Sequence, residues 1–219
     1  MAVIFDLEEF TTFCTKPQIE YRLPLFLNET FGGICSCLDP NWAEGDDYAF
    51  LLDGEAPEHT KFLGDGSLVI WRLPEEVEVQ ENFIAKLLSR LFIARETFPA
   101  LAEEFHQKYA LADIPRKLRF GIAAGEIIRL RLSKPSGGGE YVGFPINLAS
   151  RLQSYCRELG FIVSGRIGLS PTSMETLKFK QVVANDMRGI GSEIVYVDEL
   201  DYETLSSAVR DKHFELVVI

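Results

Sequence analysis

The sequence is poor in the features that mark zinc-binding, membrane-spanning and multidomain chains. It has only four cysteines in 219 residues, without the paired spacing of zinc ligands, so we expect free thiols in a reducing compartment. No run approaches the roughly 20 apolar residues of a membrane-spanning helix. No Pro-, Gly- or Ser-rich linker and no internal repeat divides the chain. Residues 1–219 are therefore expected to form a single domain.

Positive charge is also scarce. The chain has 22 Lys and Arg residues against 33 Asp and Glu residues, a net charge of −11. This balance disfavours nucleic acid or an anionic membrane surface as a partner. An anionic substrate could bind only if metal ions or a local cluster of Arg and Lys offset the repulsion from this negative charge. Acidic residues interrupt the apolar N-terminus and no basic residue precedes them, so we expect no signal peptide and a cytoplasmic protein.

Hydrophobic residues make up 47% of the chain, enough for a substantial core, and their pattern alternates between strands and helices. Two long helices are expected in residues 18–31 and 77–112, with Gly32-Gly33 ending the first and Pro99 breaking the second. Residues 39–59 are expected to be mostly loop. The other predicted strands and helices lie at 2–5, 61–71, 118–132, 147–159, 161–164, 178–184 and 193–197. This order predicts an α+β fold, an α/β sandwich with helices packed against a mixed sheet.

Two acidic residues stand at the edges of predicted strands. Asp6 directly follows the apolar run 2–5, and Asp65 lies between two glycines in a predicted hairpin. We expect Gly66 to take the positive φ of that turn. Turn chemistry alone would account for Asp65 if it stood by itself. Two carboxylates at strand edges, however, can together hold a divalent ion.

A second polar pair falls on a predicted helix. Asn147 and Arg151 are four residues apart, so both side chains project from one face. In one interpretation Asn147 is the helix N-cap and Arg151 a solvated charge. In the other, Arg151 binds a phosphate that gains negative charge and Asn147 orients a sugar oxygen.

Five segments resemble, in the same order, the catalytic domains of class III nucleotidyl cyclases. The resemblance runs from Asp6 to Leu200 and implies a ferredoxin-like core with an extra hairpin. Ala2–Phe13 is similar to the first strand of that family, Lys61–Ile70 to its metal-binding hairpin and Leu118–Ile128 to a middle strand. Tyr141–Gln153 is similar to the helix that carries its Asn and Arg, and Met187–Leu200 to its closing strands.

The resemblance implies a role for each matching position. Two Mg²⁺ or Mn²⁺ ions would be bound by Asp6, Asp65 and the main-chain carbonyl of Leu7. The transition state would be stabilised by Asn147 and Arg151. The base would be read by Lys61 and Glu140, and the terminal phosphates would be bound by Arg188. The acids would come from one subunit and the other groups from its twin. The resemblance thus implies a homodimer with two shared sites that turns a nucleoside triphosphate into a cyclic nucleotide.

The position of Glu140 bears on the choice of base, because purine cyclases usually have Asp, Thr or Cys there. A lone cyclase domain with an altered base pocket resembles the pyrimidine cyclases of Pycsar antiphage defence, whose product, cyclic UMP or cyclic CMP, would be read by a separate effector protein. We therefore expect UTP or CTP as substrate ahead of ATP, and GTP third. A catalytically silent, nucleotide-binding regulator is the alternative from another class.

Two other patterns carry no assignment. Gly138-Gly139-Glu140-Tyr141 resembles the signature of diguanylate cyclases, but that signature belongs on the metal-binding hairpin, which here is Gly64-Asp65-Gly66. The three histidines share no common spacing, so we expect no catalytic role for His59, His106 or His213.

Overall fold

The computed structural model describes residues 1–217 except 18, 39–55, 110–112 and 131–138. The loop expected at 39–59 therefore lies mostly outside the described residues. The chain divides into two compact units: the N-terminal unit, Phe5–Arg119, and the C-terminal unit, Met1–Ile4 with Phe120–Ile219. Strands β1 (Ala2–Leu7) and β4 (Leu118–Ala123) have residues in both units.

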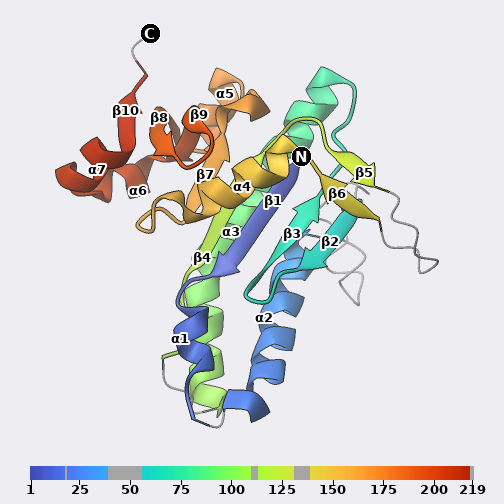
Figure 1. The fold of residues 1–219 in the computed structure, drawn as a ribbon, viewed down its shortest axis with the longest axis vertical. Helices are drawn as coiled ribbons and strands as arrows, with labels where there is room; N and C mark the ends of the chain where they lie inside the picture. The colour runs from blue at the N-terminus through green and yellow to red at the C-terminus, as the bar shows by residue number, and fades with distance from the viewer. Residues whose placement is uncertain (18, 39–55, 110–112, 131–138, 218–219) are drawn as a thin grey trace. The chain divides into compact units, whose positions relative to one another are not determined.

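The N-terminal unit places two helices side by side (Figure 1). The ring of Phe26 lies 5.1 Å from that of Phe105, edge to face. The side chains of Lys108 and Tyr109 both donate to the carboxylate of Glu29 at 2.9 Å. The elements of this unit after β1 are α1 (Phe10–Cys14), the 3-10 helix η1 (Ile19–Tyr21), α2 (Leu23–Leu38), β2 (His59–Phe62), β3 (Gly66–Ile70) and α3 (Val77–Tyr109).

Both expected helix breaks are wrong. Helix α2 passes through Gly32-Gly33 and ends at Leu38, and α3 is continuous through Pro99. In α3 the buried stripe continues beyond the proline to Phe105, so packing of the apolar face outweighs the one backbone hydrogen bond that Pro99 removes. Tertiary packing likewise offsets the low helix propensity of the two glycines.

In the part of the chain that the structure describes, backbone hydrogen bonds join eight strands in the order β10-β8-β9-β7-β4-β1-β3-β2, and β5 and β6 form a separate two-stranded hairpin. Strand β7 is parallel to β4 and antiparallel to β9. The predicted α+β class with a mixed sheet and an extra hairpin is therefore confirmed. The C-terminal unit contains β5 (Ile128–Leu130), β6 (Glu140–Val142), α4 (Phe144–Tyr155), β7 (Phe161–Ser164), η3 (Gly165–Ile167), α5 (Pro171–Thr176), β8 (Phe179–Met187), β9 (Gly191–Asp198), α6 (Glu199–Thr204), α7 (Ser207–His213) and β10 (Phe214–Leu216).

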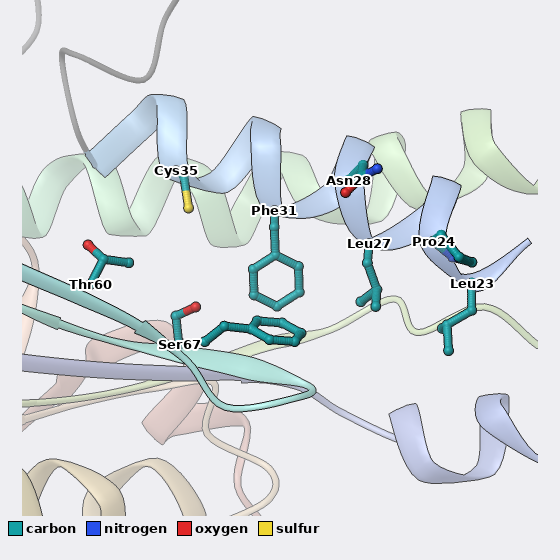
Figure 2. A pocket seen from close by; sticks show the side chains of 9 residues that line it. Leu23, Pro24, Leu27, Asn28, Phe31, Cys35, Thr60 and Ser67 are labelled. Carbon is teal, nitrogen blue, oxygen red and sulfur yellow. The ribbon is translucent and has the colours of Figure 1, made fainter. Parts of the chain in front are cut away.

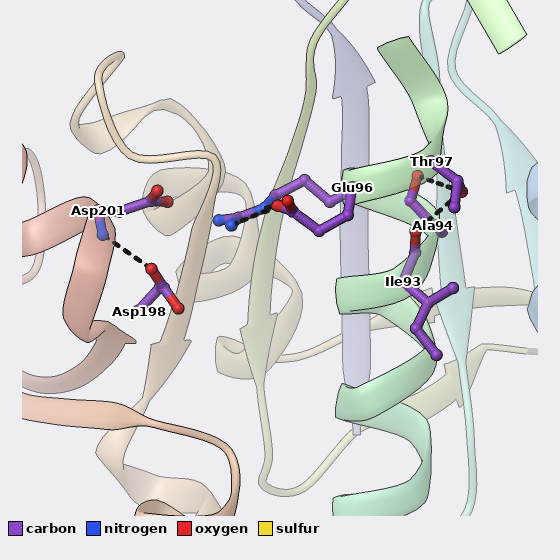
Figure 3. A network of polar contacts seen from close by, with 7 residues as sticks. Ile93, Ala94, Glu96, Thr97, Asp198 and Asp201 are labelled. Carbon is purple, nitrogen blue, oxygen red and sulfur yellow. Dashed lines mark hydrogen bonds and ion pairs between the residues drawn. The ribbon is translucent and has the colours of Figure 1, made fainter. Parts of the chain in front are cut away.

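The chain after β9 is ordered into α6, α7 and β10. The carboxylate of Asp198 caps α6 by accepting the backbone N–H of Asp201 at 2.8 Å (Figure 3). Strand β10 then pairs antiparallel with β8, with Phe214 opposite Ala184. None of the described helices combines the length and the apolar character needed to cross a bilayer.

Gly121 in β4 lets helix α4 lie directly on the sheet. A Cβ atom at this position would stand 2.0 Å from the carbonyl oxygen of Ala149 and 2.4 Å from the backbone nitrogen of Gln153, both in α4. These are backbone atoms, which cannot rotate away. Only glycine therefore permits this packing, which holds in place the helix that carries Asn147 and Arg151.

We expect Gly121→Ala to lower the free energy of unfolding by about 2 kcal/mol or more, because α4 must shift away from β4. Chemical denaturation measures the effect. The matched control is Gly32→Ala in α2, where a Cβ would meet nothing within 4 Å. There alanine should raise stability by up to about 1 kcal/mol through its higher helix propensity. Equal effects of the two substitutions would refute the role assigned to Gly121.

Candidate active site

The two candidate acids come from strands β1 and β3, which touch through their backbones. The N–H of Leu7 donates to the carbonyl of Asp65 at 2.9 Å. A Cβ on Gly66 would lie 1.8 Å from the carbonyl oxygen of Phe5, so only glycine allows this approach. The predicted site residues Asp6, Leu7 and Asp65 come from two separate stretches of the sequence. They thus lie on neighbouring backbone segments within the N-terminal unit.

The hairpin that carries Asp65 is confirmed, but its turn differs from the expected one. The N–H of Leu63 donates to the carbonyl of Gly66 at 2.8 Å, which leaves Gly64 and Asp65 as a two-residue loop. The positive φ, 106°, falls on Gly64 and not on Gly66. Glycine at the first loop position is the type II′ pattern. Asp65 is not in the left-handed region, so the turn itself makes no demand for aspartate there.

Arg119 in β4 is a member of this site that sequence reasoning missed. Its guanidinium binds both oxygens of the Asp6 carboxylate, with Nε to Oδ1 at 3.0 Å and Nη2 to Oδ2 at 2.7 Å. The two side chains are only 14% and 18% exposed, so water screens the pair weakly. The one available signal was a charged residue inside an otherwise apolar strand.

The donor set of the acid pair fits a hard divalent cation. Two carboxylates and the carbonyl of Leu7 are oxygen ligands of the kind that Mg²⁺ and Mn²⁺ prefer. Within the described ranges no group of three or more His, Cys, Asp and Glu side chains is arranged to hold a metal. Burial, and then the charge of Asp65, raise the pKa of the nearby Cys14 thiol, which keeps it protonated and unsuited as a ligand.

The predicted polar helix is α4, and it begins earlier than expected. Gly143 occupies its N-cap position and Pro145 its first turn, so Asn147 lies inside the helix and is not the N-cap. Asn147 and Arg151 are both exposed and lie one turn apart on α4. The capping interpretation of Asn147 is therefore wrong, which leaves its amide available for a ligand.

Arg151 and Arg188, predicted separately, line one cavity of about 420 Å³ in the C-terminal unit. Three segments form its walls: α4, the end of β8 with Arg188 directly after it, and α7. Asn147 lies one turn before this cavity and is not part of its lining. The lining residues are Arg151, Ser154, Tyr155, Asn185, Asp186, Met187, Arg188, Lys212 and His213. His213, to which the sequence assigned no role, is therefore part of the cavity wall.

The two candidate base-reading residues are exposed and lie in different units, Lys61 in β2 and Glu140 in β6. Because side chains alternate along a strand, Lys61 projects from the hairpin face opposite to Thr60 and Phe62. Those two residues line a second, largely apolar cavity of about 490 Å³ against α2, together with Phe31 and Ser67 (Figure 2). None of the predicted site residues lines that second cavity.

No family model matches the sequence, and no curated protein matches it either. Solved structures do match the fold. The adenylyl cyclase CyaB from P. aeruginosa is 18% identical, with a TM-score of 0.66 over 90% of this chain and 91% of that one. The guanylate cyclase domain of RhGC from Catenaria anguillulae, in complex with GTP, is 17% identical, with a TM-score of 0.58 over 89% and 93%.

A third match is the non-canonical dimeric guanylyl cyclase domain of the RhoGC fusion protein from Blastocladiella emersonii. It is 16% identical, with a TM-score of 0.56 over 90% of this chain and 94% of that domain. At these identities the comparisons establish the architecture. The chain has the fold of class III nucleotidyl cyclase catalytic domains.

Proposed function

We propose that the protein is a nucleotidyl cyclase, a phosphorus–oxygen lyase that converts a nucleoside triphosphate into the 3′,5′-cyclic monophosphate and pyrophosphate. The observation that carries the proposal is the presence of two complementary charged sites on this fold. The N-terminal unit has the acid pair Asp6 and Asp65, and the C-terminal unit has a cavity lined by Arg151 and Arg188. A reaction between a ribose hydroxyl and a triphosphate needs both kinds of group.

The reaction is an internal phosphoryl transfer. The ribose 3′-oxygen gives its proton to solvent and bonds to the α-phosphorus, while the bond from that phosphorus to the bridging oxygen breaks and pyrophosphate leaves. Positioning and charge stabilisation account for most of the rate of such a reaction. Two divalent cations, Mn²⁺ or Mg²⁺, held by Asp6, Asp65 and the Leu7 carbonyl would lower the pKa of the 3′-hydroxyl and neutralise the triphosphate.

The chain's own cations do the remaining work. Arg151 stabilises the negative charge that grows on the α-phosphate oxygens, and Asn147, one turn away on α4, orients the ribose. Arg188 binds the terminal phosphates. Arg119 balances the charge of Asp6 whenever no other cation does, which keeps that partly buried carboxylate oriented. The acidic protein thereby offers its anionic substrate a locally cationic environment.

We further propose a homodimer in which the acids of one copy face Asn147 and Arg151 of the other. Each dimer would then contain two equivalent sites at a two-fold interface. A domain of this fold is described as a non-canonical dimer, which supports assembly into dimers but not this particular arrangement.

For the base, the proposal favours UTP or CTP, because Glu140 stands where purine cyclases usually have a smaller residue. The product, cyclic UMP or cyclic CMP, would be a cytoplasmic second messenger in bacterial antiphage defence, read by a separate effector. Adenylate cyclase activity on ATP is the alternative, favoured by the adenylyl cyclase among the matching folds. A silent nucleotide-binding regulator is the second alternative.

Turnover tests the activity directly. Incubation with an equal mixture of ATP, GTP, CTP and UTP and Mn²⁺, followed by mass spectrometry, should yield pyrophosphate and one dominant cyclic nucleotide. Asp65→Asn should reduce the rate by at least about 100-fold, because asparagine suits the turn but loses the charge that holds the metal. Unchanged turnover in Asp65→Asn would remove Asp65 from the site, and nucleotide binding without any product would favour the regulator.

Base choice is tested by ratios of rates. Lys61→Gln and Glu140→Asp should each change the ratio of kcat/KM between pyrimidine and purine nucleotides by about tenfold, more than they change the rate with the best substrate. Competition assays with paired nucleotides measure this ratio. Lys178→Gln, an exposed lysine at neither site, is the control. If every variant keeps the wild-type ratio, the base-reading assignment is wrong.

The shared site is tested by mixing two inactive chains. Asp6→Ala and Arg151→Ala should each be inactive alone, and random mixing should restore about a quarter of wild-type activity, since half of the dimers are mixed and have one intact site of two. Native mass spectrometry of differently tagged chains verifies that mixed dimers form. Mixed dimers without activity would contradict a site built from two copies.

A further inference from the structure

Helix α7 supplies an additional cation to the cavity that contains Arg151 and Arg188. Lys212, in the last turn of α7, lines this cavity of about 420 Å³ together with both arginines. The charged side chains of the lining are thus three cations and one carboxylate, Asp186. This local excess of positive charge stands in a chain with a net charge of −11. Such a concave cationic site attracts small polyanions.

The three cations are not used up by internal pairing. No ion pair joins the side chains of Arg151, Arg188 or Lys212 to any residue within the described ranges. Elsewhere in the C-terminal unit, by contrast, Arg166 binds Glu193 and Lys180 binds Glu203. Like charges gathered in one cavity repel one another unless an anion lies between them. The arrangement therefore suits a ligand with more than one phosphate group.

Lys212 is carried by a fixed element. The hydroxyl of Tyr155, in the last turn of α4, lies 2.5 Å from the carbonyl oxygens of both Asn185 and His213, and can donate to either. The Tyr155 ring also meets the His213 ring edge to face, with 5.0 Å between centroids. Burial raises the pKa of Tyr155 to about 12, so the hydroxyl keeps its proton and remains a donor. This contact ties α4, which carries Arg151, to the junction of α7 and β10.

His213 contributes a surface and not a further charge. Burial, and then the neighbouring charge of Lys212, lower the pKa of its imidazole, so it is neutral near pH 7. Its ring fills the wall between Tyr155 and α7.

We propose that α7 completes the polyphosphate site and that Lys212 is a phosphate-binding residue that acts with Arg188 on the terminal phosphates of the substrate and on the pyrophosphate product. The inference rests on the proposed function in one respect, namely that a nucleoside triphosphate enters this cavity. Lys212 lies outside the five segments that resemble the cyclase family. It belongs to a helix that follows the last strand predicted from the sequence. Its ligand class is a diphosphate or triphosphate group, free or attached to a nucleoside.

Calorimetric titration of the full-length protein with inorganic pyrophosphate, without added metal, tests the site independently of turnover. Lys212→Gln should weaken binding about tenfold, as loss of a charged phosphate contact does, and Lys212→Arg should retain it. Lys178→Gln is the matched control, because it makes the same substitution on an exposed lysine of the same unit outside the cavity. Arg188→Gln should weaken binding like Lys212→Gln. Circular dichroism verifies that each variant is folded.

The outcomes separate the two proposals. Pyrophosphate that binds to neither wild type nor variants, or binds equally to wild type and Lys212→Gln, overturns the inference, as does equal weakening by Lys178→Gln. If the wild type makes no cyclic nucleotide but binds pyrophosphate, and Lys212→Gln weakens this binding, the site stands and the cyclase proposal falls. If the wild type is an active cyclase and Lys212→Gln changes neither KM nor inhibition by pyrophosphate, the cyclase stands and the role of Lys212 falls. A raised KM with weaker inhibition shows that substrate and product share the site.

Discussion

Two strand positions, Gly66 and Gly121, must be glycine because backbone atoms of another segment occupy the space of a Cβ atom. At Gly66 this backbone is the carbonyl of Phe5, and at Gly121 it is the carbonyl of Ala149 in α4. The first contact places Asp65 beside β1, next to Asp6, and the second fixes the helix that presents Asn147. Close packing at backbone level thus decides where the charged groups stand, and side-chain chemistry acts only within those limits.

Electrostatics then distinguishes the two units. In the N-terminal unit the carboxylate of Asp6 is only partly exposed to water, and Arg119 compensates its charge with two hydrogen bonds. In the C-terminal unit the cations of the cavity are exposed, so water stabilises them at little cost while no ligand is bound. The acid of the first site is thus paired with a cation of the same unit, whereas the cations of the second face water.

Local patterns predicted what depends on neighbours in sequence, and missed what depends on packing. The hairpin around Asp65 was predicted from its two glycines. Gly64 takes the positive φ of the turn, whereas Gly66 allows the backbone of β1 to approach closely. Pro99 looked like a helix break because its lost hydrogen bond is a local effect, whereas the packing that offsets it is not. Arg119 gave a weak signal, and the contribution of Lys212 gave none, because β10 must first fold back onto β8.

The distinction between an enzyme and a silent regulator depends on which groups are needed together. Binding a nucleotide requires only cations for the phosphates and a surface for the base, and the cavity lined by Arg151, Arg188 and Lys212 would suffice for that. Attack by the ribose hydroxyl also requires a group of opposite kind, a carboxylate pair able to hold a metal near the reacting oxygen. Binding alone has no use for a partly buried Asp6 whose charge is compensated by Arg119. The joint presence of both sets of groups is therefore explained better by turnover than by binding alone.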